Sequence, residues 1–369
     1  MQPTALSALS LAACVSVGFA QPATPAAPEP SKPAATPPKL LSPELARHLD
    51  GASVVEQLRA EAARTMHTIK CDGVRRLLVN TSWLPVIDGR KVYRDKAAQK
   101  VLSKAAYEAL PEDQRGSFEA LELDEEFFYY TRYGSPLSYA RPLDILCKDF
   151  GCKDYCFSKK RILDFGYGGI GHLRLLASSG AKVVGVDVDP MLAALYSEPG
   201  DTGEVAGAGI SEIKPPNGEL TLVTGRWPAE PAAVAAVGKG FDVIISKNVL
   251  KNGYIHPAKE VPKQMLVDLG VDDATFLKAI ADALNSDGRF LIYNICPKQK
   301  EDQYLPWADG SCPFSKEAIA AAGLEVLEYN VEDSGEIRRL GKALMWHEGD
   351  TPMDLDNDCF AWYTLIRKP

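Results

Sequence analysis

A glycine-rich loop is the part of this 369-residue sequence whose residue types and spacing most clearly indicate chemistry. The apolar run ILDF ends in G-Y-G-G-I-G, and helical residues follow. Glycines let a backbone turn tightly and approach a ligand without a Cβ collision. The free N–H groups and positive dipole of a helix start favour an anionic or carboxylate-bearing group. We therefore expect Gly166, Gly168 and Gly171 to form a ligand-binding loop.

Two aspartates flank this loop. Asp187 lies sixteen residues after Gly171, at the end of the next apolar run, where a carboxylate can accept hydrogen bonds from both hydroxyls of a ribose. That spacing alone also fits a nicotinamide or flavin dinucleotide. Asp164 precedes the first glycine by two residues. At roughly 4 Å it would oppose a pyrophosphate by about 1 kcal/mol in water and by several in a cleft, so it favours a ligand with a cationic group.

Alternating strands and helices are needed to position the loop. From Arg161 onward the sequence contains apolar runs typical of strands that are covered on both faces. These runs are RILDFG, KVVGVDV, LTLVTG, FDVIISKN, RFLIYNI, LEVLEYNV and the C-terminal DCFAWYTLIRK. Helical segments lie between them, and this alternation predicts an α/β domain with a parallel sheet and right-handed crossovers. We place this domain at residues 151–369.

The N-terminal segment indicates export. Residues 1–20 are largely apolar, with Gly18 and Ala20 at the −3 and −1 positions of a signal-peptide cleavage site. A second interpretation is a lipid anchor at Cys14, because LAAC resembles the acylation motif of bacterial lipoproteins. No run of 18 apolar residues occurs, so we expect no membrane-spanning helix. We expect a periplasmic or secreted protein, or a cytoplasmic one if the leader is not functional.

A linker and a cap come between the leader and the α/β domain. Seven prolines in residues 21–39 predict an extended, semi-rigid spacer. Residues 40–150 are expected to form a mostly helical cap, because apolar residues recur there at three- and four-residue spacing, for example in KAAQKVLSKAAYEAL at 96–110. Aromatic residues near the end of this cap form either part of its core or a wall over a ligand.

Composition and cysteine spacing exclude some classes of ligand. The net charge of −8 argues against a nucleic-acid partner, which needs a basic face. Cys147, Cys152 and Cys156 lack an obvious fourth ligand, so we expect no metal site. In an exported protein we expect disulfides instead, with one thiol left over. The cysteines available for pairing are Cys71, Cys147, Cys152, Cys156, Cys296, Cys312 and Cys359.

Beyond these inferences, the sequence from about Arg161 to Pro369 resembles the class I S-adenosylmethionine-dependent methyltransferases. The DFGYGGIG loop and the VVGVDVDP segment carry the resemblance, together with FDVIISKNVLKNGYI and LNSDGRFLIYN. It implies a doubly wound, Rossmann-like, seven-stranded sheet in the order 3-2-1-4-5-7-6, with strand 7 antiparallel. It also implies S-adenosyl-L-methionine as cofactor and methyl transfer to a small molecule or a protein side chain, because the N/D-P-P-Y motif of nucleic-acid methyltransferases is absent.

The resemblance also assigns site residues. Asp164 and the loop glycines would hold the methionine moiety, Asp187 would hold the ribose, and Val188 would lie beside the adenine. The tip of the fourth strand, Ser246-Lys247-Asn248, would face the transferred methyl group. Many family members carry an acidic residue after the third strand, but this sequence has Arg226 and Trp227 there, and Trp227 stacking is one substitute. The cofactor-binding residues expected on this basis are Asp164, Gly166, Gly168, Gly171, Asp187, Val188, Arg226, Trp227 and Lys247.

Catalysis by in-line displacement depends mainly on alignment, and a base is needed only for a protonated acceptor. His256 is the best candidate base, the alternative being a solvent-facing loop histidine. His172 either shapes the cofactor site or caps a helix, and Tyr130, Arg132 and Tyr139 are candidates for a clamp on the cofactor carboxylate. Two other functions stay open. One is a nicotinamide-dependent oxidoreductase, and the other is a non-catalytic exported protein with this fold, because S-adenosylmethionine is not expected to be plentiful outside the cell.

Overall fold

A computed structural model describes residues 53–369, except for residues 132–133, 153, 210–213 and 350–351. The predicted leader, the lipid-anchor site at Cys14 and the proline-rich linker lie outside the described residues. Arg132, one of the three candidates for the carboxylate clamp, lies outside them as well.

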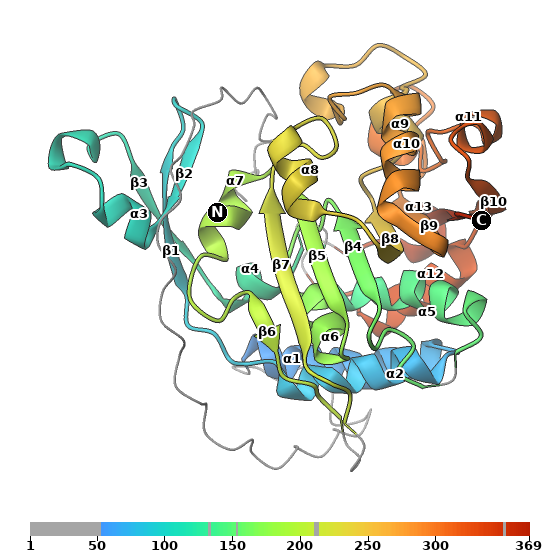
Figure 1. Ribbon diagram of the computed structural model, residues 1–369, viewed down its shortest axis with the longest axis horizontal. Coiled ribbons are helices and arrows are strands. Elements are labelled where there is room, and N and C mark those ends of the chain that lie inside the picture. Colours follow the sequence, from blue (N-terminus) through green and yellow to red (C-terminus); the bar gives the residue numbers. More distant parts are fainter. Residues whose placement is uncertain (1–52, 132–133, 153, 210–213, 350–351) are drawn as a thin grey trace.

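A mixed eight-stranded sheet forms the centre of the protein (Figure 1). Its strands are β4 (Arg161–Phe165), β5 (Lys182–Asp187), β6 (Gly203–Val205), β7 (Gly218–Thr224), β8 (Phe241–Lys247), β9 (Leu284–Cys296), β10 (Glu325–Glu332) and β11 (Phe360–Arg367). They lie in the order β10-β11-β9-β8-β4-β5-β7-β6. The five central strands are parallel, whereas β11 runs antiparallel to both of its neighbours and β6 is an antiparallel edge strand. Without β6, and numbered along the chain, the order is 3-2-1-4-5-7-6.

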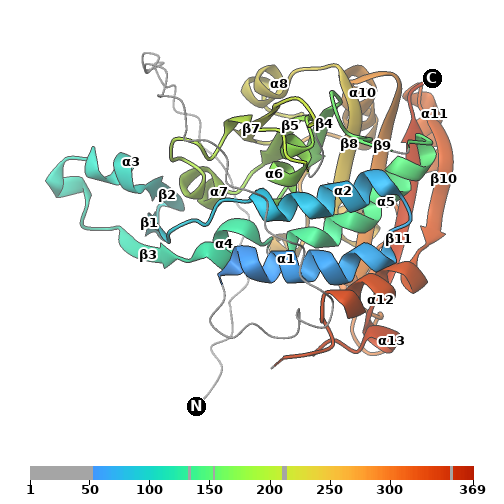
Figure 2. The same cartoon turned by 90° about the horizontal axis from the view of Figure 1, so that it is seen from below.

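Helices cover both faces of this sheet. Lying on one face, and grouped together in Figure 2, are α1 (Val54–Thr65), α2 (Asp72–Val79), α5 (Ala140–Asp149) and α6 (Gly171–Ser178). The opposite face is covered by α8 (Pro231–Val237), α10 (Asp273–Ala283) and α11 (Lys316–Ala321). Two hydrophobic cores result: the first core lies under α1, α2, α5 and α6, and the second core lies under α8, α10 and α11. In β9, Leu291 and Tyr293 pack into the first core, while Phe290 and Ile292 pack into the second. A strand buried on both faces therefore reads as a continuous apolar run, as the sequence shows.

The N-terminal helices share a core with the α/β domain. Val55 of α1, Leu78 of α2 and Leu146 of α5 belong to the same buried cluster as Ile162 of β4 and Leu365 of β11. Other helices are α4 (Glu125–Tyr129), α7 (Pro190–Leu195), α9 (Asn252–Ile255), α12 (Ser334–Ala343) and α13 (Leu355–Asp358). The cap is thus part of the body that holds the glycine loop.

The helix predicted for residues 96–110 forms only at residues 104–108, and the prediction is wrong for residues 96–103. An antiparallel sheet in the order β2-β1-β3 occupies this region and lies beside α7 in Figure 1. The strands of this sheet are β1 (Arg90–Asp95), β2 (Lys100–Ser103) and β3 (Glu119–Leu123), and the short helix α3 (Lys104–Glu108) follows β2. Gln99, with a φ of 51°, lies in the turn between β1 and β2, and the Tyr93 ring of β1 stacks on Tyr107 of α3 at 3.6 Å. Strand pairing and this ring contact override the helical preference of the alanines and lysines.

The disulfide pairing expected from the sequence is also wrong for this structure, because all seven cysteines in the described part are free thiols. Cys296, Cys312 and Cys359 are buried, where a thiol packs as a small apolar group. Within the described ranges, no group of three or more potential ligand side chains is arranged to hold a metal ion. No described helix is both long enough and apolar enough to cross a membrane.

Candidate cofactor-binding site

The glycine loop lies where the strand order of the sheet reverses. It follows β4, which pairs with β5 on one side and with β8 on the other, and crevices at such positions are the usual ligand sites of open α/β sheets. Gly166 and Gly168 have φ values of 74° and 59°, which glycine adopts at no steric cost. The Gly166 N–H donates to the Val186 carbonyl at 2.8 Å, which fixes the loop against β5.

The loop glycines have different neighbours. A Cβ added to Gly166 would lie 2.5 Å from Val249 Cγ2, and one added to Gly171 would lie 2.5 Å from the Tyr129 carbonyl oxygen. A Cβ on Gly168 would meet nothing closer than Thr131 Cβ, at 3.9 Å. Gly166 and Gly171 therefore serve close packing within the chain, whereas Gly168 leaves space beside the loop.

We expect Gly166→Ala to lower the free energy of unfolding by about 2–4 kcal/mol, because left-handed strain of roughly 1–2 kcal/mol adds to an overpacking cost of similar size. Gly168→Ala should cost only the strain, about 1–2 kcal/mol. Urea unfolding of the two variants measures the difference. Equal losses would contradict the crowding of Gly166 by Val249.

Asp187 lies at the end of β5 and contacts the loop directly. Its carboxylate accepts hydrogen bonds from the Gly168 N–H at 3.1 Å and from the Asp189 N–H at 3.0 Å. Burial raises the pKa of Asp187 to about 6, although these backbone donors oppose the shift. At neutral pH the group is mostly ionised and acts as an acceptor, which is what two ribose hydroxyls require.

Asp164 forms a buried pair with His172 of α6. The Asp164 Oδ2 atom lies 2.5 Å from His172 Nε2, and each side chain is 1% exposed. The His172 ring stacks on Tyr139 with ring centroids 3.6 Å apart. Burial lowers the pKa of His172 although Asp164 opposes the shift, so we assign a neutral imidazole that donates from Nε2. Asp164 Oδ1 and His172 Nδ1 have no hydrogen-bond partner among the described residues.

Lys247 completes this group, which we call the Asp164 cluster: Asp164, His172, Tyr139 and Lys247. Lys247 ends β8, is 5% exposed and places its ammonium 4.9 Å from the centre of the Tyr139 ring. Burial lowers the pKa of Lys247 to about 8, while the charge of Asp164 opposes that shift. The sequence predicted Asp164 and Lys247 as site residues, and it offered His172 as a residue that shapes the cofactor site and Tyr139 as a carboxylate clamp. It did not indicate that His172 would pair with Asp164 and stack on Tyr139.

The structure places the residues predicted beside the adenine in varied surroundings. Val188, the residue after β5, is exposed. Arg226 forms an ion pair with Asp268 at 3.0 Å. Trp227 is 3% exposed and packs edge-on against Phe165 and Phe276, so the structure uses Trp227 for core packing.

The predicted base, His256, contacts a residue outside the Asp164 cluster. It follows α9, and its Nε2 atom is hydrogen-bonded to Asp273 Oδ2 at 2.8 Å, with side chains that are 47% and 34% exposed. The Tyr130 hydroxyl donates to Glu61 of α1 at 2.7 Å, which is a contact within the cap. Tyr139 belongs to the Asp164 cluster. The clamp on the cofactor carboxylate by Tyr130, Arg132 and Tyr139 stays a prediction.

Comparisons with known proteins give likenesses to solved structures. No protein family and no curated protein matches the sequence. A structure described as a sarcosine dimethylglycine methyltransferase from Galdieria sulphuraria aligns at 13% identity over 65% of this chain and 93% of its own, with a TM-score of 0.37. The 4+2 cyclase SpnF aligns at 15% identity over 62% and 81%, with a TM-score of 0.37. Haemonchus contortus phosphoethanolamine N-methyltransferase 2, in complex with S-adenosylhomocysteine, aligns at 16% identity over 63% and 53%, with a TM-score of 0.35.

The chain's own topology establishes its fold. The strand order, the antiparallel β11 and the glycine loop after the first strand of the sheet are the features that the sequence resemblance implied. The protein therefore has the class I S-adenosylmethionine-dependent methyltransferase fold.

Proposed function

We propose that the protein binds S-adenosyl-L-methionine at the glycine loop and transfers its methyl group to a small molecule or a protein side chain. The pair of aspartates around the loop carries this proposal. Asp187 contacts the loop through the Gly168 N–H, and Asp164 keeps one buried oxygen without a partner. A ribose and an amino acid ammonium are the groups that these two carboxylates suit.

The residues present fit such a ligand. Asp164 Oδ1 is an acceptor that a cationic donor would satisfy, and an unsatisfied buried oxygen otherwise carries a cost of about 1–3 kcal/mol. Gly168 leaves room for close approach of a ligand to the backbone. A pyrophosphate would place further negative charge beside Asp164 and Asp187. The two carboxylates therefore favour S-adenosylmethionine over a dinucleotide.

Lys247 is the residue that we propose as the proton acceptor, in place of His256. When bound, the cofactor supplies a methyl group on a positively charged sulfur that is open to in-line displacement. Burial lowers the pKa of the Lys247 amine to about 8, so about a tenth of it is unprotonated at pH 7 and about half at pH 8, and that fraction can accept a proton as a general base must. Lys247 lies within the Asp164 cluster, whereas His256 is bound to Asp273.

Calorimetric titration of the full chain with S-adenosylhomocysteine tests the binding step. We expect saturable binding of one ligand per chain, and no binding of NADH under the same conditions. Binding of NADH without S-adenosylhomocysteine would support the oxidoreductase alternative. A folded protein that binds neither would contradict the proposal.

A further inference from the structure

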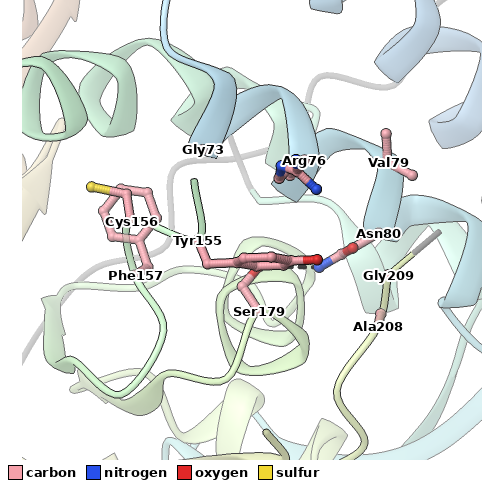
Figure 3. Close-up of a pocket in the computed structure, with 10 residues that line it drawn as sticks. All are labelled: Gly73, Arg76, Val79, Asn80, Tyr155, Cys156, Phe157, Ser179, Ala208 and Gly209. Atoms are coloured by element: carbon pink, nitrogen blue, oxygen red, sulfur yellow. Dashed lines mark hydrogen bonds between the residues drawn. The ribbon is translucent and has the colours of Figure 1, made fainter. Parts of the chain in front are cut away.

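Four of the free thiols lie in one region of the first core, which we call the thiol cluster: Cys71, Cys147, Cys152 and Cys156. Cys71 is the residue before α2, Cys147 lies in the last turns of α5, and the other two follow α5 in the segment that leads to β4. Figure 3 shows Cys156 and Gly73 at a small pocket, with the Cys156 sulfur directed away from Arg76. None of these thiols has a role in the proposed methyl transfer.

Contacts with α5 hold Cys71 close to Cys147. The Cys71 thiol lies 3.6 Å from the carbonyl oxygen of Asp144, and the Cys71 N–H donates to the Asp144 carboxylate at 2.8 Å. Cys147 lies three residues after Asp144, so it is on the same side of the helix. Cys147 interacts with the thiols of both Cys71 and Cys156, and its own thiol lies 3.8 Å from the Cys152 carbonyl oxygen.

Gly73 shows how tightly the cluster is packed. A Cβ added at Gly73 would lie 3.0 Å from Cys156 Cβ and 3.1 Å from Cys147 Sγ. The absence of a side chain there lets α2 approach the sulfur atoms. Cys147 is therefore the central sulfur, with Cys71 and Cys156 beside it.

The thiols differ in reactivity and access. The hydrogen bonds from Cys156 and Cys71 lower the pKa of Cys147 although its burial opposes the shift. Burial, together with the neighbouring Cys147, raises the pKa of Cys71 to about 12. Cys147 is fully buried, whereas Cys71 is only half-buried. Cys147 is thus the thiol of the pair that ionises more readily, and a thiolate is the nucleophile in disulfide exchange. Cys71 is the sulfur that an external reagent can reach.

We propose that Cys71 and Cys147 form a redox-active pair, which the structure shows in its reduced form and which closes reversibly to a disulfide. Cys71 loses its proton to solvent and attacks an incoming small disulfide such as oxidised glutathione, which gives a mixed disulfide on Cys71, and the displaced glutathione thiolate takes up a proton. The Cys147 thiolate then attacks Cys71 Sγ and displaces the second glutathione. The two protein thiols lose two protons and two electrons, and the glutathione disulfide gains them to give two thiols.

Closure has a physical consequence for the cap. The disulfide would join residues 76 positions apart and link the start of α2 to the end of α5. A cross-link over a long loop restricts the unfolded chain and so stabilises the folded one. The oxidised protein should therefore unfold at a higher temperature than the reduced protein.

The test equilibrates the full chain in buffers of increasing oxidised-to-reduced glutathione ratio, blocks the free thiols and maps the disulfides by mass spectrometry. Trypsin separates the four cysteines, because Arg75, Lys148 and Lys153 lie between them. We expect a Cys71–Cys147 linked peptide that disappears on reduction, and a melting temperature that rises by several degrees with oxidation. Cys71→Ser, at the half-buried position, should abolish both changes.

Cys312→Ser is the matched control, since Cys312 is buried in the second core, and this variant should keep the link and the thermal shift. Eight free thiols in the full chain at the most oxidising ratio would overturn the proposal. A Cys147–Cys156 link that persists in Cys71→Ser would overturn the assigned pair. These outcomes are independent of S-adenosylhomocysteine binding, so they do not depend on the proposed function.

Discussion

Replacing Asp187 by alanine is expected to weaken S-adenosylhomocysteine binding by roughly 5- to 150-fold. The carboxylate is positioned by the Gly168 and Asp189 N–H groups, and the loss of its hydrogen bonds to a ribose costs about 1–3 kcal/mol. Calorimetric titration of the variant and the natural chain at pH 7.5 measures the change. Asp189→Asn is the matched control, because Asp189 is exposed and asparagine retains its capping role at the start of α7.

The same carboxylate predicts how binding depends on pH. Burial raises the pKa of Asp187 to about 6, so the group gains a proton as the pH falls below 6 and loses acceptor capacity. Affinity should therefore drop between pH 7.5 and pH 5, and Asp187→Ala should lose most of that dependence. An unchanged affinity in Asp187→Ala would remove Asp187 from the site.

Replacing Arg141 by methionine is expected to lower the free energy of unfolding by about 3–5 kcal/mol. Arg141 of α5 holds the Asp333 carboxylate through two hydrogen bonds, at 2.8 and 2.7 Å. The Asp333 side chain is only 5% exposed, and Tyr293 is its other side-chain donor. Removing the cation leaves a buried charge without compensation, which is strongly destabilising. Chemical denaturation at pH 7 measures the loss.

Arg75→Met provides the comparison for this prediction. Arg75 pairs with Asp72 at 2.8 Å, but the two side chains are 42% and 64% exposed, and exposed pairs contribute only about 0–1 kcal/mol. If Arg141→Met and Arg75→Met lose similar stability, the Arg141–Asp333 pair is not the buried contact that holds α5 to the C-terminal part of the chain.

The centre of the sheet was predictable because β4, β5, β8 and most of β9 are buried on both faces. Runs such as RILDFG and FDVIISKN have apolar residues at consecutive positions, which an amphipathic helix or a surface strand does not show. The aspartates could be placed because each follows from its position in such a run: Asp164 near the end of β4 and Asp187 at the end of β5. Strand identity and strand end together locate a side chain at one edge of the sheet.

Other features depend on contacts between distant segments. Residues 96–110 have the composition of a helix, but pairing of β1 with β2 and the contact of Tyr93 with Tyr107 determine their structure. The His172 ring lies between Asp164 and Tyr139 because α6 and the segment before α5 converge, and no local pattern encodes that convergence. Trp227 follows a predicted strand in the sequence, but its side chain packs into the hydrophobic core.

The crowding of the glycine loop by the cap changes what its composition means. Gly169 and Gly171 face the carbonyl oxygens of Tyr130 and Tyr129, where an added methyl group would collide at 2.7 and 2.5 Å. Two of the four glycines in this loop are thus required by packing against the Tyr129–Tyr130 segment of the cap. Glycine content alone therefore overstates how many glycines of such a loop contact a ligand. If this loop were grafted into a protein that lacks the upstream segment, two of its glycines would no longer be needed for packing.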